Sequence, residues 1–202
     1  MKIAIQQPYF YPYLGYFQLI KSVDKFVFFN DVQYIRRGWI NRNRISENFY
    51  LSVPIKKSSQ KTLINKIEIS YDNNWHYKHC KSLEVKYGKY CEKNPVYLFY
   101  KNIPKYKFLV DLLKNSIKNV CDVLEIKTEF IDSEIIDIDE NIRNKDRIIE
   151  ICSRLKAKDY YNLPNGKKLY NKEDFRKNNI KLKFIDTSNI KNKFSILDVC
   201  LS

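Results

Sequence analysis

The sequence predicts a single α/β domain whose mostly parallel, Rossmann-like sheet carries helices on both faces. Strand-like and helix-like segments alternate at both ends of the 202-residue chain, as βαβ units require. Hydrophobic residues make up 44% of the composition, which suits one buried core, and the chain is too short for two independent cores. Glycine is scarce, with four residues, and no repeat, linker or low-complexity segment divides the chain. We expect one domain over residues 1–202, with a helical subregion at about residues 75–124.

The first forty residues predict a strand, a loop, a helix and a second strand. Residues 2–6 are a short apolar run that Pro8 stops, which indicates a buried strand. Residues 13–23 place apolar side chains at helical spacing. Residues 25–30 are nearly all apolar, and their aromatic and β-branched content favours a buried strand. Ligands of such folds bind beyond the carboxyl ends of the strands, so the loop after the first strand lies at the expected place for a site.

The middle of the chain changes from strands to helices. Residues 49–55 and 66–70 look like strands, separated by a polar stretch that indicates an exposed loop. Residues 75–86 and 106–124 carry apolar residues three and four positions apart, as amphipathic helices do. Between these helices, residues 95–104 are a short aromatic segment that begins and ends with proline.

The last third of the chain returns to alternating elements. Residues 126–131 predict a strand and residues 146–155 an amphipathic helix. Residues 158–163 predict another strand, which a Pro-Asn-Gly turn follows. A short helix and a final strand are expected at residues 172–177 and 182–185.

Composition excludes some classes of protein and favours others. No apolar run approaches the roughly 20 residues that a membrane-spanning helix needs. Gln6, Gln7 and Pro8 break the first apolar run before a secretory signal could form, so we expect a cytoplasmic protein. Five cysteines without a CxxC pair indicate reduced thiols, mostly small core residues. The net charge of +14 attracts polyanions such as nucleic acids, anionic headgroups or nucleotide-linked sugars, although many of the lysines are scattered.

The segment after the first strand combines amides, tyrosines, prolines and a glycine where a helix begins. Gln6 and Gln7 can hydrogen-bond a ligand from the strand's end, and Gly15 lets a ligand approach the backbone closely. The helix start offers free N–H groups to a phosphate or carboxylate. An aromatic core corner is the structural alternative, but it would leave several tyrosine hydroxyls unpaired at a cost. We therefore favour a ligand site, to which Tyr9 and Tyr16 also contribute.

The run Tyr13-Leu14-Gly15-Tyr16 is loosely similar to a signature of nucleotidylyltransferases and class I synthetases. In that unit a strand precedes a Pro-rich turn, and a His-x-Gly-His sequence opens the next helix. Tyrosines replace both histidines here, so contacts to ATP phosphates would be made differently or are absent. The similarity supports the fold more than it supports ATP chemistry.

The segment after the second predicted strand is the densest group of candidate binding residues. Asp31 is the natural carboxylate to bind an ammonium or hydroxyl group, or to accept a proton. Four arginines can hold phosphate or carboxylate bidentately, and Trp39 can stack on a base or sugar ring. A basic surface loop is the alternative, but the interleaved tryptophan, asparagines and glycine favour a binding function. The arginines are Arg36, Arg37, Arg42 and Arg44, and the other candidate binding residues are Asn30, Gln33, Tyr34, Asn41 and Asn43.

Both histidines of the protein lie at the predicted start of one helix. His76, His79 and Cys80 would supply at most three metal ligands, and no fourth is near in sequence, so we expect no metal. His76 is a candidate general base, although a partly exposed histidine without a catalytic role fits equally well. The polar loop that follows the strand at 158–163 is another segment that could meet the first-strand loop across a parallel sheet.

These residues also carry a resemblance to the WbqC-like family of bacterial polysaccharide gene clusters. The family's opening pattern, QPY-F-PY-GYFQLI and then D-FV-DDVQY-RGW-NRN, stands here as residues 7–20, 24–27 and 30–43. Asn30 occupies a position where the family usually has an acidic residue, so a role for paired carboxylates there would rest on Asp31 alone. The similarity continues to the carboxyl terminus through Trp75, Tyr87, Pro95 and residues 146–155 and 195–198.

The resemblance implies a role in O-antigen or capsule biosynthesis, with glycine or another aminoacyl group transferred to an amino sugar. The leading hypothesis is a transferase that forms an amide on a nucleotide- or lipid-linked amino sugar, with ATP or an activated amino-acid (acyl) donor as co-substrate. Asp31 would orient or deprotonate the amine, and we expect Gln7, Gly15 and Asp31 to line one pocket with the arginines at its rim. Glycosyl transfer fits the same residues. A non-catalytic nucleic-acid-binding module is the alternative of another class, although we expect no stable nucleic-acid complex.

Overall fold

The computed structural model describes residues 1–103 and 106–202, which form two compact units. The sheet unit comprises Met1–Gln7, Gly15–Phe29 and Ile126–Asn192. The helical unit comprises Pro8–Leu14, Asn30–Glu125 and Lys193–Ser202. The prediction of one domain over the whole chain stays a prediction.

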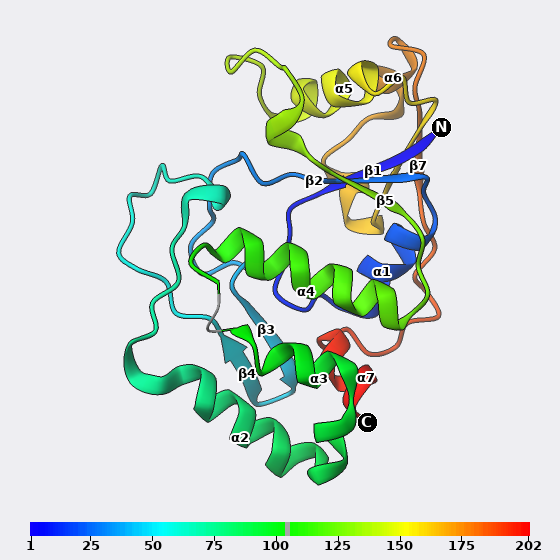
Figure 1. The fold of residues 1–202 in the computed structure, drawn as a ribbon. Coiled ribbons are helices and arrows are strands. Elements are labelled where there is room, and N and C mark those ends of the chain that lie inside the picture. Colours follow the sequence, from blue (N-terminus) through cyan, green and yellow to red (C-terminus); the bar gives the residue numbers. More distant parts are fainter. Residues whose placement is uncertain (104–105) are drawn as a thin grey trace. The chain divides into compact units, whose positions relative to one another are not determined.

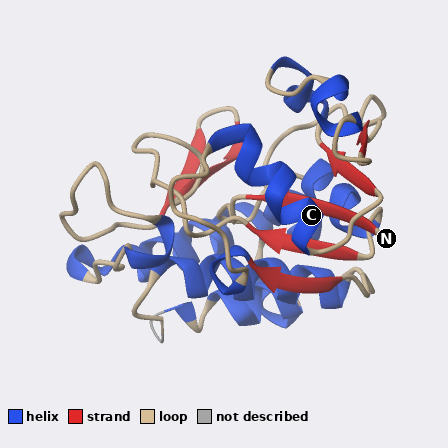
Figure 2. Ribbon diagram, turned by 90° about the horizontal axis from the view of Figure 1, so that it is seen from above, coloured by secondary structure: helices blue, strands red, loops and turns tan. Residues whose placement is uncertain are grey.

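The sheet unit is built on five parallel strands in the order β5-β2-β1-β6-β7, which Figure 2 shows side by side. After β1, the chain adds β2 and β5 on one side of it and then β6 and β7 on the other side, so the strand order reverses between β1 and β6. This is the point at which doubly wound sheets bind ligands, beyond the carboxyl ends of their strands. The predicted α/β class with a mostly parallel sheet is confirmed. The strands are β1 (Lys2–Gln6), β2 (Lys25–Phe28), β5 (Glu129–Asp132), β6 (Asp159–Asn162) and β7 (Lys181–Phe184).

Helices cover both faces of this sheet (Figure 1). Successive side chains of a strand point to opposite faces, so Ile3 and Ile5 face one side of β1 and Ala4 the other. On the isoleucine side, α5 (Asn144–Arg154) and α6 (Lys172–Arg176) complete an aliphatic core. On the other side, α1 (Leu14–Lys21) packs the ring of Tyr16 edge-on against Phe26, with centroids 5.4 Å apart. Burial of these faces is the main stabilising contribution to the unit.

In the part of the helical unit that the structure describes, an antiparallel hairpin is combined with four α-helices. The last helix is fixed to the others by polar contacts, because Tyr87 donates a hydrogen bond to Asp198 Oδ1 at 2.7 Å and Ser195 caps the helix. Helix α4 packs against α3 and a short 3-10 helix. The elements are β3 (Arg42–Ser46), β4 (Phe49–Ser52), α2 (Trp75–Tyr87), α3 (Pro95–Tyr100), α4 (Leu109–Val123) and α7 (Ile196–Leu201). Short 3-10 helices among the residues that the structure describes include Ile64–Lys66, Asp72–Asn74, Lys89–Lys93, Ser133–Ile135 and Pro164–Lys168.

The structure differs from the sequence predictions mainly in the helical unit. The predicted strand at residues 66–70 is wrong, because this segment forms only isolated bridges, through Glu68 and Ile69, instead of a ladder. Strand β3 and helix α7 were not predicted. The aromatic segment at residues 95–104 forms helix α3, and its expected end at Pro104 lies outside the described residues. No helix among the residues that the structure describes is long and apolar enough to cross a membrane.

Candidate functional site

In the sheet unit, two side-chain amides meet at the ends of the strands that flank the reversal of strand order. Gln6 ends β1 and Asn162 ends β6, and Gln6 Nε2 donates to Asn162 Oδ1 at 2.5 Å. The same oxygen accepts from the backbone N–H of Leu163 at 2.7 Å, and Asn162 Nδ2 donates to the Tyr160 hydroxyl at 3.1 Å. Asn162 is buried and its orientation is fixed by these bonds. It therefore holds Gln6 at the ligand-binding edge of the sheet.

Gly166 makes room for this amide pair. A Cβ atom at position 166 would lie 2.6 Å from Asn162 Nδ2 and 2.9 Å from its Cγ, closer than real Cβ contacts allow. The glycine is buried in the short 3-10 helix that follows β6. The position of Asn162, and through it that of Gln6, thus depends on a glycine at this position.

Three other predicted binding residues lie close to the first strand in sequence, and each is at least partly buried. Tyr16 is fully buried, and its hydroxyl donates to the backbone oxygen of Gln7 at 2.9 Å, so this hydroxyl braces the turn after β1. Gly15 is buried in the first turn of α1. Tyr9 is half-buried, and burial raises the pKa of its hydroxyl.

In the helical unit, the Arg-rich segment lines a cationic cleft with a volume of about 430 Å³. Five of the predicted binding residues gather there, together with two lysines from the loop after β4 that sequence reasoning did not single out. We call this group of residues the cationic cleft. Its lining is Tyr34, Arg36, Arg37, Asn41, Arg42, Ser52, Ile55, Lys56, Lys57 and Ser58.

A chain of hydrogen bonds fixes the floor of the cationic cleft. The Tyr34 hydroxyl donates to Asn41 Oδ1, and Asn41 Nδ2 donates to the carbonyl of Val53, both at 2.8 Å. Burial raises the pKa of Tyr34, and the positive charges of Arg36 and Arg42 lower it in part. Tyr34 therefore stays a neutral donor near pH 7, and its donor is already used by Asn41.

Backbone carbonyls hold two of the three arginines, Arg36 and Arg42, and leave further N–H donors for an anion. Arg42 Nε donates to the Gly38 carbonyl at 3.0 Å, and an Nη donates to the Arg37 carbonyl at 2.6 Å. A guanidinium has five N–H donors in a planar fork, so three remain on Arg42. The Cζ atom of Arg42 lies 5.5 Å from the ring centroid of Trp39, which is about half exposed. Arg36 similarly donates to the carbonyl of Ser58.

Most of the positive charge in the cationic cleft has no carboxylate beside it. Lys56 forms an ion pair with Glu68 at 2.7 Å, and the two side chains are 62% and 31% exposed, so solvent screens the pair and it contributes little to stability. Among the residues that the structure describes, no carboxylate forms an ion pair with the three arginines or with Lys57. The cleft therefore offers several unneutralised cations to an anionic ligand.

The remaining residues of the Arg-rich segment lie outside the cationic cleft. Asn43 is buried, and its Nδ2 donates to the carbonyls of Phe10 at 3.1 Å and Tyr11 at 2.6 Å, which fixes that turn. Arg44 lies 4.8 Å over the ring of Phe194. Gln33 donates to the Gln60 carbonyl at 2.7 Å and joins two loops.

Asp31 and Asn30 follow β2. Asn30 is fully buried, and its backbone oxygen accepts a hydrogen bond from the N–H of Asn65 at 3.0 Å. Asp31 is half-buried. The expectation that Gln7, Gly15 and Asp31 share one pocket stays a prediction.

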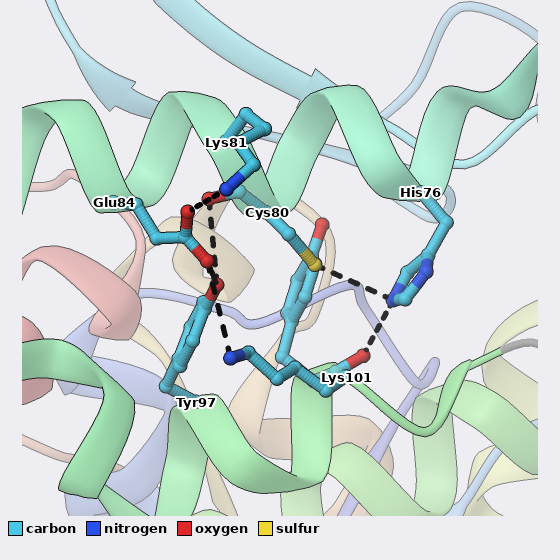
Figure 3. A network of polar contacts seen from close by, with 7 residues as sticks. His76, Cys80, Lys81, Glu84, Tyr97 and Lys101 are labelled. Carbon is cyan, nitrogen blue, oxygen red and sulfur yellow. Dashed lines mark hydrogen bonds and ion pairs between the residues drawn. The ribbon is translucent and has the colours of Figure 1, made fainter. Parts of the chain in front are cut away.

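The two histidines lie in a polar network between α2 and α3, and Figure 3 shows the part that includes His76. His76 Nε2 lies 2.9 Å from the carbonyl oxygen of Tyr100 and 3.6 Å from Cys80 Sγ. A carbonyl only accepts, so Nε2 carries the proton and the lone pair of neutral His76 is on Nδ1. Any base chemistry at His76 must therefore use Nδ1. His79 Nδ1 lies 2.8 Å from the Tyr100 hydroxyl, and burial, followed by the charge of His76, lowers the pKa of His79 to about 4.

The rest of this network favours a structural role. Burial raises the pKa of the Cys80 thiol, which disfavours a nucleophilic thiolate. The Tyr97 hydroxyl donates to Glu84 Oε1 at 2.8 Å and joins the two helices (Figure 3). In the part of the chain that the structure describes, no three His, Cys, Asp or Glu side chains are grouped so as to hold a metal ion.

Comparison with known proteins gives two matches. A sequence profile described as the WbqC-like protein family matches residues 7–201, which confirms the resemblance. A curated relative from Mycobacterium tuberculosis, named uncharacterized protein Rv1507c, is 26% identical, and the alignment covers 92% of this chain and 82% of that protein. No solved structure shows a significant match. The family match includes residues of both units.

Proposed function

Because the chain belongs to the WbqC-like protein family, we propose that it is a transferase of bacterial surface polysaccharide biosynthesis, in O-antigen or capsule assembly. Its reaction forms an amide on the amino group of a nucleotide- or lipid-linked sugar. Glycine or another aminoacyl group comes from an activated donor, with ATP supplying the activation if the donor is a free amino acid. The enzyme acts in the cytoplasm, where such sugars are made.

The cationic cleft is the observation that supports this proposal most. Nucleotide-linked and lipid-linked sugars both carry a phosphate or diphosphate, which is the group that unpaired guanidinium donors bind best. Arg36, Arg37 and Arg42 present such donors in a volume of about 430 Å³. Trp39, beside Arg42, offers a ring on which a sugar or base can stack.

The transfer step needs a base near the amine. The amine nitrogen attacks the acyl carbon, the bond from that carbon to the donor's leaving group breaks, and the surplus proton of the amine passes to the base. We assign that role to Asp31, which also orients the amine, and His76 is the second candidate through Nδ1.

The proposal is tested in cells that lack the native gene. Wild-type protein restores the acylated amino sugar in the surface glycan, and mass spectrometry measures it. Asp31→Asn abolishes restoration, and the double variant Arg36→Gln/Arg37→Gln reduces it strongly. The control Arg143→Gln/Arg154→Gln removes the same charge from exposed positions of the sheet unit and restores the glycan fully. Full restoration by Asp31→Asn would contradict the proposal at its main residue.

The same experiment separates the other two functions. A glycosyltransferase defect removes a whole sugar from the repeat unit instead of an acyl group. The net charge of +14 and the half-exposed Trp39 favour nucleic-acid binding as the alternative outside enzymes. That function predicts affinity for single-stranded RNA that falls steeply with salt and an unchanged glycan in every variant.

A further inference from the structure

We propose that the sheet unit has a second ligand site, a cavity of about 670 Å³ beside β6 and β7 that binds a nucleoside diphosphate. The proposal rests on residues of the sheet unit alone, so it holds whether or not the cationic cleft binds a sugar donor. We call this site the lysine cavity. Its volume is within the range of roughly 300–1,000 Å³ that is usual for small-molecule sites.

The lysine cavity lies where a doubly wound sheet places its ligands. Phe184 is the last residue of β7 and pairs in register with Asn162, the last residue of β6. Lys167 and Lys168 belong to the short 3-10 helix that directly follows β6. The cavity therefore opens beyond the carboxyl ends of both strands, and β6 is one of the two strands at the reversal of strand order.

Three lysines make the lysine cavity cationic. Lys167, Lys168 and Lys172 are exposed, and none forms an ion pair with a carboxylate among the residues that the structure describes. The neighbouring acid Glu173 pairs instead with Arg176 at 2.9 Å. Lys167 Nζ lies 5.9 Å from the ring centroid of Phe184 and also interacts electrostatically with the carboxylate of Asp186. A phosphate entering the cavity still meets ammonium groups that no carboxylate holds in an ion pair, and a diphosphate can contact more than one of them.

Apolar and aromatic side chains form the other walls of the lysine cavity. Phe184 and Tyr170 are half-buried against the core, which fixes their rings, and Tyr170 packs edge-on to Phe175 with centroids 5.8 Å apart. Leu169, which is 73% exposed, adds apolar surface to the same cavity. Fixed rings are suitable surfaces for stacking a planar base.

These two kinds of lining together select the ligand class. An inorganic anion would use the lysines and leave the rings and Leu169 exposed to water. A neutral sugar would leave the ammonium groups unpaired. A nucleoside diphosphate carries a planar base and two phosphates in one molecule, so it uses both parts of the lysine cavity.

Isothermal titration of the full chain with ADP, adenosine and pyrophosphate tests the proposal. All proteins carry Arg36→Gln/Arg37→Gln, which weakens phosphate binding in the cationic cleft. ADP binds the parent protein saturably. The triple variant Lys167→Gln/Lys168→Gln/Lys172→Gln weakens ADP binding roughly tenfold or more, because charge-assisted hydrogen bonds to phosphate are lost. The control Lys158→Gln/Lys177→Gln/Lys191→Gln removes the same charge from exposed lysines and retains the affinity.

A second variant tests the base. Phe184→Leu keeps an apolar side chain but removes the ring, so it weakens ADP and adenosine binding roughly fivefold and leaves pyrophosphate binding unchanged. Circular dichroism confirms that each variant is folded. The proposal is overturned if ADP does not bind, if the two lysine triples weaken it equally, or if Phe184→Leu affects neither ADP nor adenosine. If the triple variant Lys167→Gln/Lys168→Gln/Lys172→Gln loses ADP binding but still restores the cell glycan, this site is supported and the proposed function, which rests on the cationic cleft, is unaffected.

Discussion

Replacing Gly166 by alanine tests the structure at the ends of β1 and β6. The new Cβ would lie 2.6 Å from Asn162 Nδ2, so the amide of Asn162 must move. Asn162 is 4% exposed and makes hydrogen bonds to Gln6, Leu163 and Tyr160, all of which depend on its present orientation. The substitution therefore acts through the hydrogen bonds of Asn162.

The expected cost follows from those bonds. Loss of three hydrogen bonds at about 1 kcal/mol each amounts to about 3 kcal/mol. Alanine restricts the unfolded chain more than glycine does, which returns about 0.5–1 kcal/mol. We expect Gly166→Ala to destabilise the protein by about 2 kcal/mol, which lowers the midpoint of thermal unfolding by about 4–8 °C for a chain of this size.

A double-mutant cycle separates this mechanism from a general effect of the substitution. Asn162→Ala alone costs about 3 kcal/mol, because it removes the same three bonds. In the double variant the added Cβ at position 166 no longer meets an amide at position 162, so the total stays near 3 kcal/mol instead of the additive 5 kcal/mol, a coupling of about −2 kcal/mol. Urea unfolding followed by circular dichroism measures all four proteins. Additivity within about 0.5 kcal/mol would show that the two residues do not interact as described.

Three further predictions concern buried groups. Since the pKa of His79 falls to about 4 from an ordinary 6.5, the unfolded chain binds the proton first, so stability rises with pH between about 4 and 6.5. Urea midpoints measured across that range should show a weaker pH dependence in His79→Gln. Asn43→Ala removes the hydrogen bonds to the carbonyls of Phe10 and Tyr11, of which only the second keeps another donor, the Ser195 hydroxyl. At about 1 kcal/mol for each bond it should lower stability by about 2 kcal/mol, seen as a lower urea midpoint; an unchanged midpoint would contradict its structural role. Burial raises the pKa of Cys121 and Cys152 to about 12, so a thiol reagent should modify the half-buried Cys200 well before either of them.

The sheet unit was predictable because its signals are local. Buried parallel strands are continuous apolar runs, and each of the five predicted segments in this unit overlaps one observed strand, with ends that agree to within three residues. The order of the strands is not local, however, because it depends on which segments pair far apart in the sequence. Asn162 therefore was not singled out within the predicted strand at residues 158–163, although strand order places it beside Gln6 at the reversal point.

The helical unit was harder to predict because its elements depend on tertiary partners. Strand β3 has the sequence Arg-Asn-Arg-Ile-Ser, which lacks the apolar run of a buried strand, and only pairing with β4 makes it a strand. Residues 66–70 have a strand-like sequence but find only single bridging partners. Lys56 and Lys57 read as part of an exposed loop, and their place in the cationic cleft becomes visible only when the loop is folded back beside β4.

The alternation of side chains along β3 explains why one polar segment serves two purposes. Asn43 and Ile45 point into the helical unit and are buried, whereas Arg42 and Arg44 lie on the other face and keep part of their surface in water. The sequence alone predicted that Arg42, Asn43 and Arg44 all bind a ligand. The strand assigns the asparagine to holding the backbone and Arg42 to the cationic cleft. Substitutions at positions 42 and 43 should therefore have different effects. A substitution of Arg42 should weaken anion binding in a protein that still folds, whereas a substitution of Asn43 should lower the stability of the fold.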